Sequence, residues 1–164
     1  MIESLFWTIA GTIRSNVDPF NELSDASVWR VLEQASLGEK VRRLDAGLEH
    51  EVTESGCRLS LGERQLLCLA RALARGCRIL LMDEATAALD PHTDHAIQQM
   101  MQHEFKDCTV VTVAHRINTI LDADRVLVMD KGRVIEFDRP DVLLRNPGSH
   151  FYALALAAGL KSRQ

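Results

Sequence analysis

The sequence lacks one combination that would otherwise settle its chemistry, because none of its nine glycines is followed by lysine. The phosphate loop G-x-x-x-x-G-K followed by Ser or Thr is therefore absent from this chain. Its four cysteines (Cys57, Cys68, Cys77 and Cys108) form no C-x-x-C pair. This spacing does not indicate a metal site, and we expect small buried thiols in a reducing compartment rather than disulfides.

Long hydrophobic runs and an excess of basic residues are also missing. The longest uncharged apolar run near the start, Ser4 to Ile13, is about half the length of a membrane span, and no basic residue precedes it. The formal net charge of -4 gives no electrostatic case for a nucleic-acid partner. We therefore expect no nucleic acid, and any association with a membrane would come through other domains.

Apolar periodicity and capping residues predict helices that alternate with strands. The expected helices cover residues 24–35, 37–44, 60–75, 90–103, 140–145 and 149–160, and the expected strands cover 79–82, 109–113, 125–129 and 133–136. Successive apolar residues in the first of these strands predict a parallel strand that is covered on both faces. The turn Asp130-Lys131-Gly132 predicts a hairpin between the last two. This order predicts the α/β class.

The segment from Ser60 to Glu63 has the S-x-x-E pattern of a helix capping box, and apolar residues at helical spacing follow it. A hydroxyl and free backbone N–H groups at a helix start can bind an anion, with about 0.3–1 kcal/mol from the helix field and up to about 2 when partly buried. Ser60 can equally serve only as the cap of its own helix. The two roles are compatible.

Asp83 and Glu84 follow the apolar strand 79–82, at the edge of the sheet where ligands of α/β proteins bind. This pattern suits an acid that holds Mg²⁺ through water and a base that deprotonates an attacking water. A general base of this kind typically raises the reaction rate about 10²–10⁴-fold. His115 follows the next strand, so we expect it at the same edge. The alternatives are solvated acids at a strand end and a structural histidine.

Four motifs in this order resemble the nucleotide-binding domain of ABC transporters. They are SLGERQ at 60–65 (signature), MDEAT at 82–86 (Walker B), ALD at 88–90 (D-loop) and AHR at 114–116 (H-loop). The segments GTIRSN at 11–16 and VIE at 134–136 resemble the multidrug-resistance-associated subfamily C, in particular its second nucleotide-binding domain. Two positions depart from the common signature: Leu61 stands where a glycine is usual, as in that subfamily, and Glu63 stands in place of glutamine.

The resemblance implies part of a P-loop NTPase fold of the ABC ATPase type, a parallel sheet core with a helical signature subdomain. We expect residues 1–10 to lie outside the match, and residues 11–164 to be the C-terminal part of the domain, with its helical part at about 20–76 and its catalytic sheet part at about 77–160. The N-terminal strands and the Walker A loop would then be missing.

The resemblance also implies ATP and Mg²⁺ as cofactors, and a second nucleotide-binding domain and transmembrane domains as partners. Two such domains enclose two ATP molecules, so the signature residues of one domain contact the ATP of the other. The implied residues are Ser60, Leu61, Gly62, Glu63 and Gln65 for the partner's ATP, Asp83 for Mg²⁺ through water, Glu84 and His115 for catalysis, and Asp90 for the dimer interface.

From these residues we expect a cytoplasmic domain that is held at a membrane by transmembrane domains outside the chain, and that couples ATP hydrolysis to export. Without a Walker A loop, the chain alone is expected to be inactive. Two other functions stay open: a non-catalytic module that docks on another ABC domain, and part of a soluble ABC ATPase.

Overall fold

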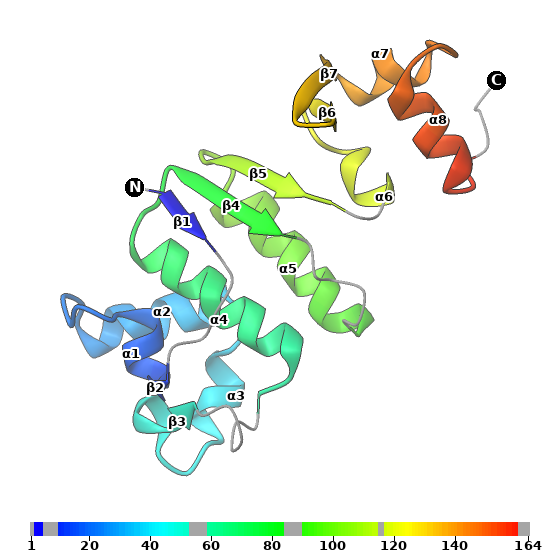
Figure 1. Ribbon diagram of the computed structural model, residues 1–164. Helices are drawn as coiled ribbons and strands as arrows, with labels where there is room; N and C mark the ends of the chain where they lie inside the picture. Colours follow the sequence, from blue (N-terminus) through cyan, green and yellow to red (C-terminus); the bar gives the residue numbers. More distant parts are fainter. Residues whose placement is uncertain (1, 5–9, 53–58, 84–89, 115–116, 161–164) are drawn as a thin grey trace. The chain divides into compact units, whose positions relative to one another are not determined.

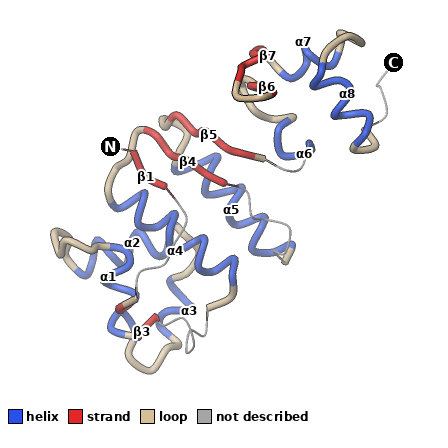
Figure 2. The backbone as a smooth tube through the Cα atoms, in the orientation of Figure 1, coloured by secondary structure: helices blue, strands red, loops and turns tan. Residues whose placement is uncertain are grey.

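The computed structural model describes residues 2–4, 10–52, 59–83, 90–114 and 117–160. The chain forms two compact units, Met1–Val113 and Ala114–Gln164, which we treat separately. Figures 1 and 2 show that both units contain helices and strands. The predicted α/β class is therefore confirmed.

The first unit contains a parallel sheet whose order is β1-β4-β5, formed by β1 (Ile2–Ser4), β4 (Ile79–Asp83) and β5 (Thr109–Val113). Both predicted strands of this unit are confirmed. Leu80 is fully buried, whereas Leu81 is 37% exposed and β5 is exposed along its length. The prediction that the first strand is covered on both faces is thus wrong for the described residues, because apolar partners cover only the Leu80 side.

Helices make up most of the first unit (Figure 1). They are α1 (Ile13–Val17), α2 (Asp25–Gln34), α3 (Gly38–Arg42), the 3₁₀ turn η1 (Gly47–Glu49), α4 (Leu61–Ala74) and α5 (Pro91–Glu104). A small antiparallel pair, β2 (Gly11–Thr12) and β3 (Glu51–Val52), lies beside α1. Helix α4 packs against α1, α2 and α5, so it is the central helix of this unit.

The core of the first unit is one apolar cluster to which its helices and sheet contribute. Its fully buried members include Ile13 of α1, Leu32 of α2, Leu67 and Leu69 of α4, and Leu80 of β4. Cys68 and Cys77 are buried free thiols, as expected, and Cys108 is only partly buried. Cys57 lies outside the described residues.

The helix ends follow the predicted capping residues. Ser24, Ser60 and Asp90 are the N-caps of α2, α4 and α5, and each side chain accepts a hydrogen bond from the backbone N–H three residues later. Gly76 follows α4 with φ of +56°, a left-handed conformation that only glycine adopts without strain. Helix α1, which the sequence did not predict, begins with a capping box between Thr12 and Ser15.

The second unit contains α6 (Ile117–Ile120), the hairpin of β6 (Val126–Asp130) and β7 (Arg133–Asp138), α7 (Pro140–Leu144) and α8 (His150–Ala157). The predicted hairpin is confirmed, and both turn residues, Lys131 and Gly132, have positive φ. Val126, Leu143 and Phe151 form a separate small core.

Glu136 of β7 joins the hairpin to α8. Its carboxylate accepts hydrogen bonds from the Ser149 hydroxyl (2.9 Å) and from the N–H groups of His150 (2.7 Å) and Phe151 (3.0 Å). Burial raises the pKa of Glu136, but the hydrogen bonds from Phe151, His150 and Ser149 outweigh it, so the pKa is lowered from its ordinary value. A β-bulge between the two strands leaves Ile135, the residue before Glu136, without a partner.

Across the described ranges, no helix is both long and apolar enough to cross a membrane.

Candidate functional site

The first turn of α4 holds most of the residues that the signature motif predicts as binding residues. Ser60 adopts an extended conformation as the N-cap, and its Oγ accepts the Glu63 N–H at 3.2 Å. In return, Glu63 Oε2 accepts the Ser60 N–H at 2.8 Å. Both halves of the predicted capping box are thus formed, and the turn is held by two hydrogen bonds.

The remaining signature residues differ in exposure. Gly62 is buried, Gln65 is partly buried, and Leu61 is 43% exposed at the first helical position. Ser60 is exposed. The turn therefore presents a hydroxyl and an apolar side chain to the outside, while Gly62 brings backbone into the protein interior.

Glu63 makes a second contact that sequence reasoning missed. Its Oε1 lies 3.2 Å from the ammonium nitrogen of Lys40, which belongs to α3. The two oxygens of this carboxylate are therefore divided between the Ser60 N–H and a cation from another helix. No local pattern could have revealed Lys40, because an ion pair between residues so far apart in the chain depends on how α3 and α4 pack.

The geometry of this turn fits a phosphate group. A hydroxyl that accepts one hydrogen bond still has its own proton to donate, and the first N–H groups of a helix have no acceptor within the helix. Ser60 Oγ and the Leu61 N–H belong to exposed residues and are thus the donors that this turn offers to an anion. The negative charge of Glu63 would oppose that anion, and Lys40 neutralises it.

The carboxyl ends of β4 and β5 meet at one edge of the sheet. In the parallel pairing of these strands, Asp83 is the register partner of Val113. The two strands therefore end at the same edge of the sheet, as the sequence predicted. Glu84 and His115 lie outside the described ranges, and Asp83 is described only in its backbone, so their catalytic and Mg²⁺ roles stay predictions.

Asp90 has a clear local role as the N-cap of α5. Its carboxylate accepts hydrogen bonds from the Thr93 hydroxyl (2.6 Å) and the Thr93 N–H (3.0 Å). These hydrogen bonds lower the pKa of Asp90 from its ordinary value, and the one from the Thr93 hydroxyl has the largest effect. The expected contact of Asp90 with a partner domain is not tested by this geometry.

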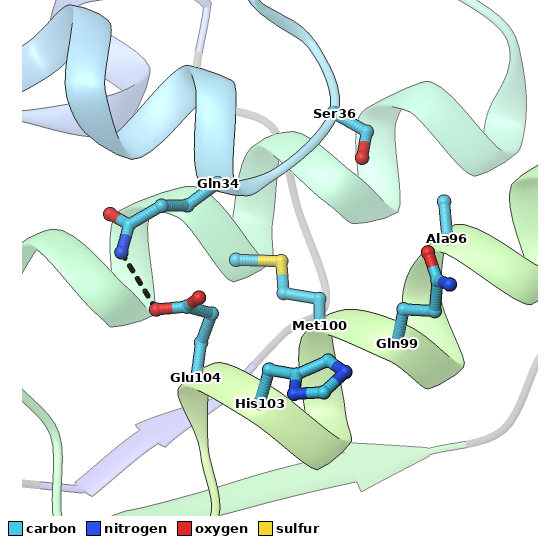
Figure 3. A pocket seen from close by; sticks show the side chains of 7 residues that line it. All are labelled: Gln34, Ser36, Ala96, Gln99, Met100, His103 and Glu104. Atoms are coloured by element: carbon cyan, nitrogen blue, oxygen red, sulfur yellow. Dashed lines mark hydrogen bonds between the residues drawn. The ribbon is translucent and has the colours of Figure 1, made fainter.

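A small pocket lies between the end of α2 and α5, and no predicted site residue is among those that line it. Figure 3 shows its lining residues: Gln34, Ser36, Ala96, Gln99, Met100, His103 and Glu104. Gln34 donates a hydrogen bond to Glu104 across it at 2.7 Å. Because this bond joins two exposed side chains and no predicted residue lines the pocket, we assign it no role in catalysis.

Comparison with known proteins gives the family. The family model described as "ABC transporter" matches residues 5–87, about half of the chain. The chain is 52% identical over 153 residues to human ATP-binding cassette sub-family C member 2, 50% identical over 151 residues to metal resistance protein YCF1 of Saccharomyces cerevisiae, and 51% identical over 150 residues to the vacuolar heme ABC transmembrane exporter abc3 of Schizosaccharomyces pombe. These matches cover 93%, 92% and 92% of the chain but only 10% of each relative.

The resemblance inferred from the four motifs is therefore confirmed, and with it the likeness to subfamily C. The family implies a P-loop NTPase fold, and the α/β architecture agrees with it. The chain belongs to the ABC transporter family.

Proposed function

We propose that this chain is part of a nucleotide-binding domain that couples ATP hydrolysis to export by a subfamily C transporter. The observation that carries the proposal is the first turn of α4, in which Ser60 and Glu63 form a closed capping box at the signature position of a chain that belongs to this family. The three relatives support the transport role, since one is named as an exporter and another as a resistance protein.

The proposed mechanism divides the residues between two nucleotides. Ser60, Leu61, Gly62, Glu63 and Gln65 face the ATP that is bound mainly by a second nucleotide-binding domain. There the Ser60 hydroxyl and the Leu61 N–H would donate to phosphate oxygens. Transmembrane domains, which hold the domain at the cytoplasmic side of a membrane, would convert closure of the two domains into transport.

The carboxyl edge of β4 and β5 serves the second nucleotide. Asp83 would hold Mg²⁺ through water, and the ion would neutralise charge on the phosphates when bound. Glu84 would accept a proton from the attacking water, His115 would orient it, and Asp90 would lie at the interface between the two domains. The chain would then divide into two functional parts: a helical part at about 20–76, which contains the signature residues, and a sheet part at about 77–160, which contains the catalytic residues.

By itself the chain is proposed to be inactive, because its sequence contains no Gly-Lys pair and hence no Walker A loop. The test is phosphate release from Mg-ATP by the purified chain, with Glu84→Gln as the matched control. We expect equal background release from both. Release by the chain that disappears in Glu84→Gln would refute the proposed inactivity.

A second candidate function is a docking module without catalysis. It is favoured by one observation, namely that the α4 turn is preformed while the sequence lacks the loop that would bind a nucleotide of its own. The test for both functions is binding of the chain to an intact subfamily C nucleotide-binding domain with and without a non-hydrolysable ATP analogue. We expect binding only with the analogue and its loss in Ser60→Ala. The hypothesis that the chain is part of a soluble ABC ATPase has weaker support, because the relatives named above are transporters or resistance proteins.

A further inference from the structure

Glu63 creates an electrostatic conflict in the turn that the proposed function assigns to phosphate. The Glu63 side chain is 22% exposed and lies within one helical turn of the Ser60 hydroxyl. A negative charge at a helix N-terminus is favourable for the helix itself, but it competes with any second anion at the same place. A phosphate-binding turn that contains Glu63 therefore needs a compensating cation.

Lys40 supplies that cation from α3. Its ammonium nitrogen lies 3.2 Å from Glu63 Oε1, while Glu63 Oε2 remains on the Ser60 N–H. In the described structure, the other charged side chains of α3 and of its C-terminal end pair away from α4. Arg42 forms an ion pair with Glu33 and stacks on Trp29. Arg43 forms an ion pair with Glu39 at 3.0 Å. Lys40 is thus the residue through which this helix contacts the capping box.

We propose that Lys40 is a positioning residue for the phosphate-binding turn of α4. It neutralises Glu63 and holds that carboxylate against the Ser60 N–H, so that the Ser60 hydroxyl and the Leu61 N–H stay directed at the nucleotide of the partner domain. The inference rests on the proposed function, because it assigns Lys40 to the same turn. It also explains how this chain uses glutamate where the signature usually has an uncharged glutamine.

The alternative is an ordinary surface ion pair, which contributes about 0–1 kcal/mol to folding and nothing to binding. The positioning role and the ordinary ion pair predict different results when Glu63 loses its charge. If Lys40 acts by compensating Glu63, then Glu63→Gln removes the need for Lys40. If Lys40 only stabilises the fold, the double variant recovers no nucleotide-dependent binding.

The experiment measures binding of the full chain to an intact subfamily C nucleotide-binding domain in the presence of Mg²⁺ and a non-hydrolysable ATP analogue. We expect Lys40→Met to weaken this binding about three- to tenfold and Lys40→Arg to retain it. Glu63→Gln removes the charge that competes with the phosphate and frees Lys40 from its ion pair, so it should bind more tightly than the wild type. The double variant Lys40→Met/Glu63→Gln should recover wild-type affinity. Arg43→Met is the matched control, because it removes an exposed cation of the same region and should change nothing.

Two results separate this inference from the proposed function. If Ser60→Ala abolishes analogue-dependent binding while Lys40→Met leaves it unchanged, or if the double variant binds as weakly as Lys40→Met, the role of Lys40 is refuted and the proposed function stands. If the wild type binds equally with and without the analogue, the proposed function fails and the role of Lys40 fails with it. Circular dichroism of each variant establishes that the helices are intact.

Discussion

Glu136 gives the sharpest test of how the second unit is held together. Its carboxylate accepts three hydrogen bonds at the start of α8, from the Ser149 hydroxyl and the His150 and Phe151 N–H groups, and the side chain is 14% exposed. Hydrogen bonds to a charged group contribute about 1.5–3 kcal/mol. Because the site remains partly open to water, we take the lower end, about 1.5 kcal/mol, for the substitution Glu136→Gln.

The assay is amide hydrogen exchange of the α8 segment, followed by mass spectrometry. A local free energy of about 1.5 kcal/mol corresponds to roughly tenfold faster exchange in Glu136→Gln at neutral pH. Glu39→Gln is the matched control, since the Glu39 side chain is 82% exposed and pairs only with Arg43 of its own region. We expect no change in α8 exchange for that variant.

The pH dependence of this difference follows from the sign of the pKa shift. The pKa of Glu136 is lower in the folded chain than its ordinary value, so the carboxylate stabilises the fold fully above the ordinary value. The stabilisation is lost as pH falls through the folded pKa. Glutamine carries no charge at any pH, so wild type and Glu136→Gln should converge in acid. Equal exchange at neutral pH, or a difference that persists unchanged in acid, would refute this account.

Two further predictions concern the ends of helices. Gly76→Ala should destabilise the first unit by about 1–2 kcal/mol, because φ at this position is +56°. A denaturant midpoint equal to that of the wild type would contradict this prediction. The control is Gly148→Ala, a substitution at a position without positive φ. Asp90→Ala should lower the stability of helix α5, because the cap of its first turn is lost, whereas Asp90→Asn should retain most of the capping. The lowered pKa of Asp90 means that its contribution is present above its ordinary value of 3.8 and is lost in acid, so the effect of Asp90→Ala should fade at low pH in a circular dichroism titration.

The sequence predicted the features that depend on neighbouring residues. The caps Ser60 and Asp90 and the hairpin turn at Lys131-Gly132 were all found, because each is decided within about four residues. Helix α1 was missed because its five residues, Ile13–Val17, give too short an apolar pattern. The exposure of Leu81 was missed because apolarity of a strand says nothing about which elements cover each face.

The candidate site shows the same division. Ser60, Gly62 and Glu63 were predicted to share one helix turn, and they do. The ion pair between Lys40 and Glu63 was not predicted, because it depends on how two helices pack. The parallel register of Asp83 with Val113 agrees with the expected meeting of two strand ends, but Glu84 and His115 lie outside the described residues, so their roles await measurement.

The pairing of β6 with β7 is local in the sequence, and this has a consequence for the rate at which the hairpin forms. The β6–β7 hairpin closes through a two-residue turn, and Glu136 meets Ser149 only 13 positions later. Short loops close in about 10–100 ns and hairpins form in about 1–10 μs, so little chain entropy must be lost before these contacts form. The first unit must instead bring Ile2 to Ile79 before its sheet can form. The β6–β7 hairpin is therefore expected to form much faster than the pairing of β1 with β4.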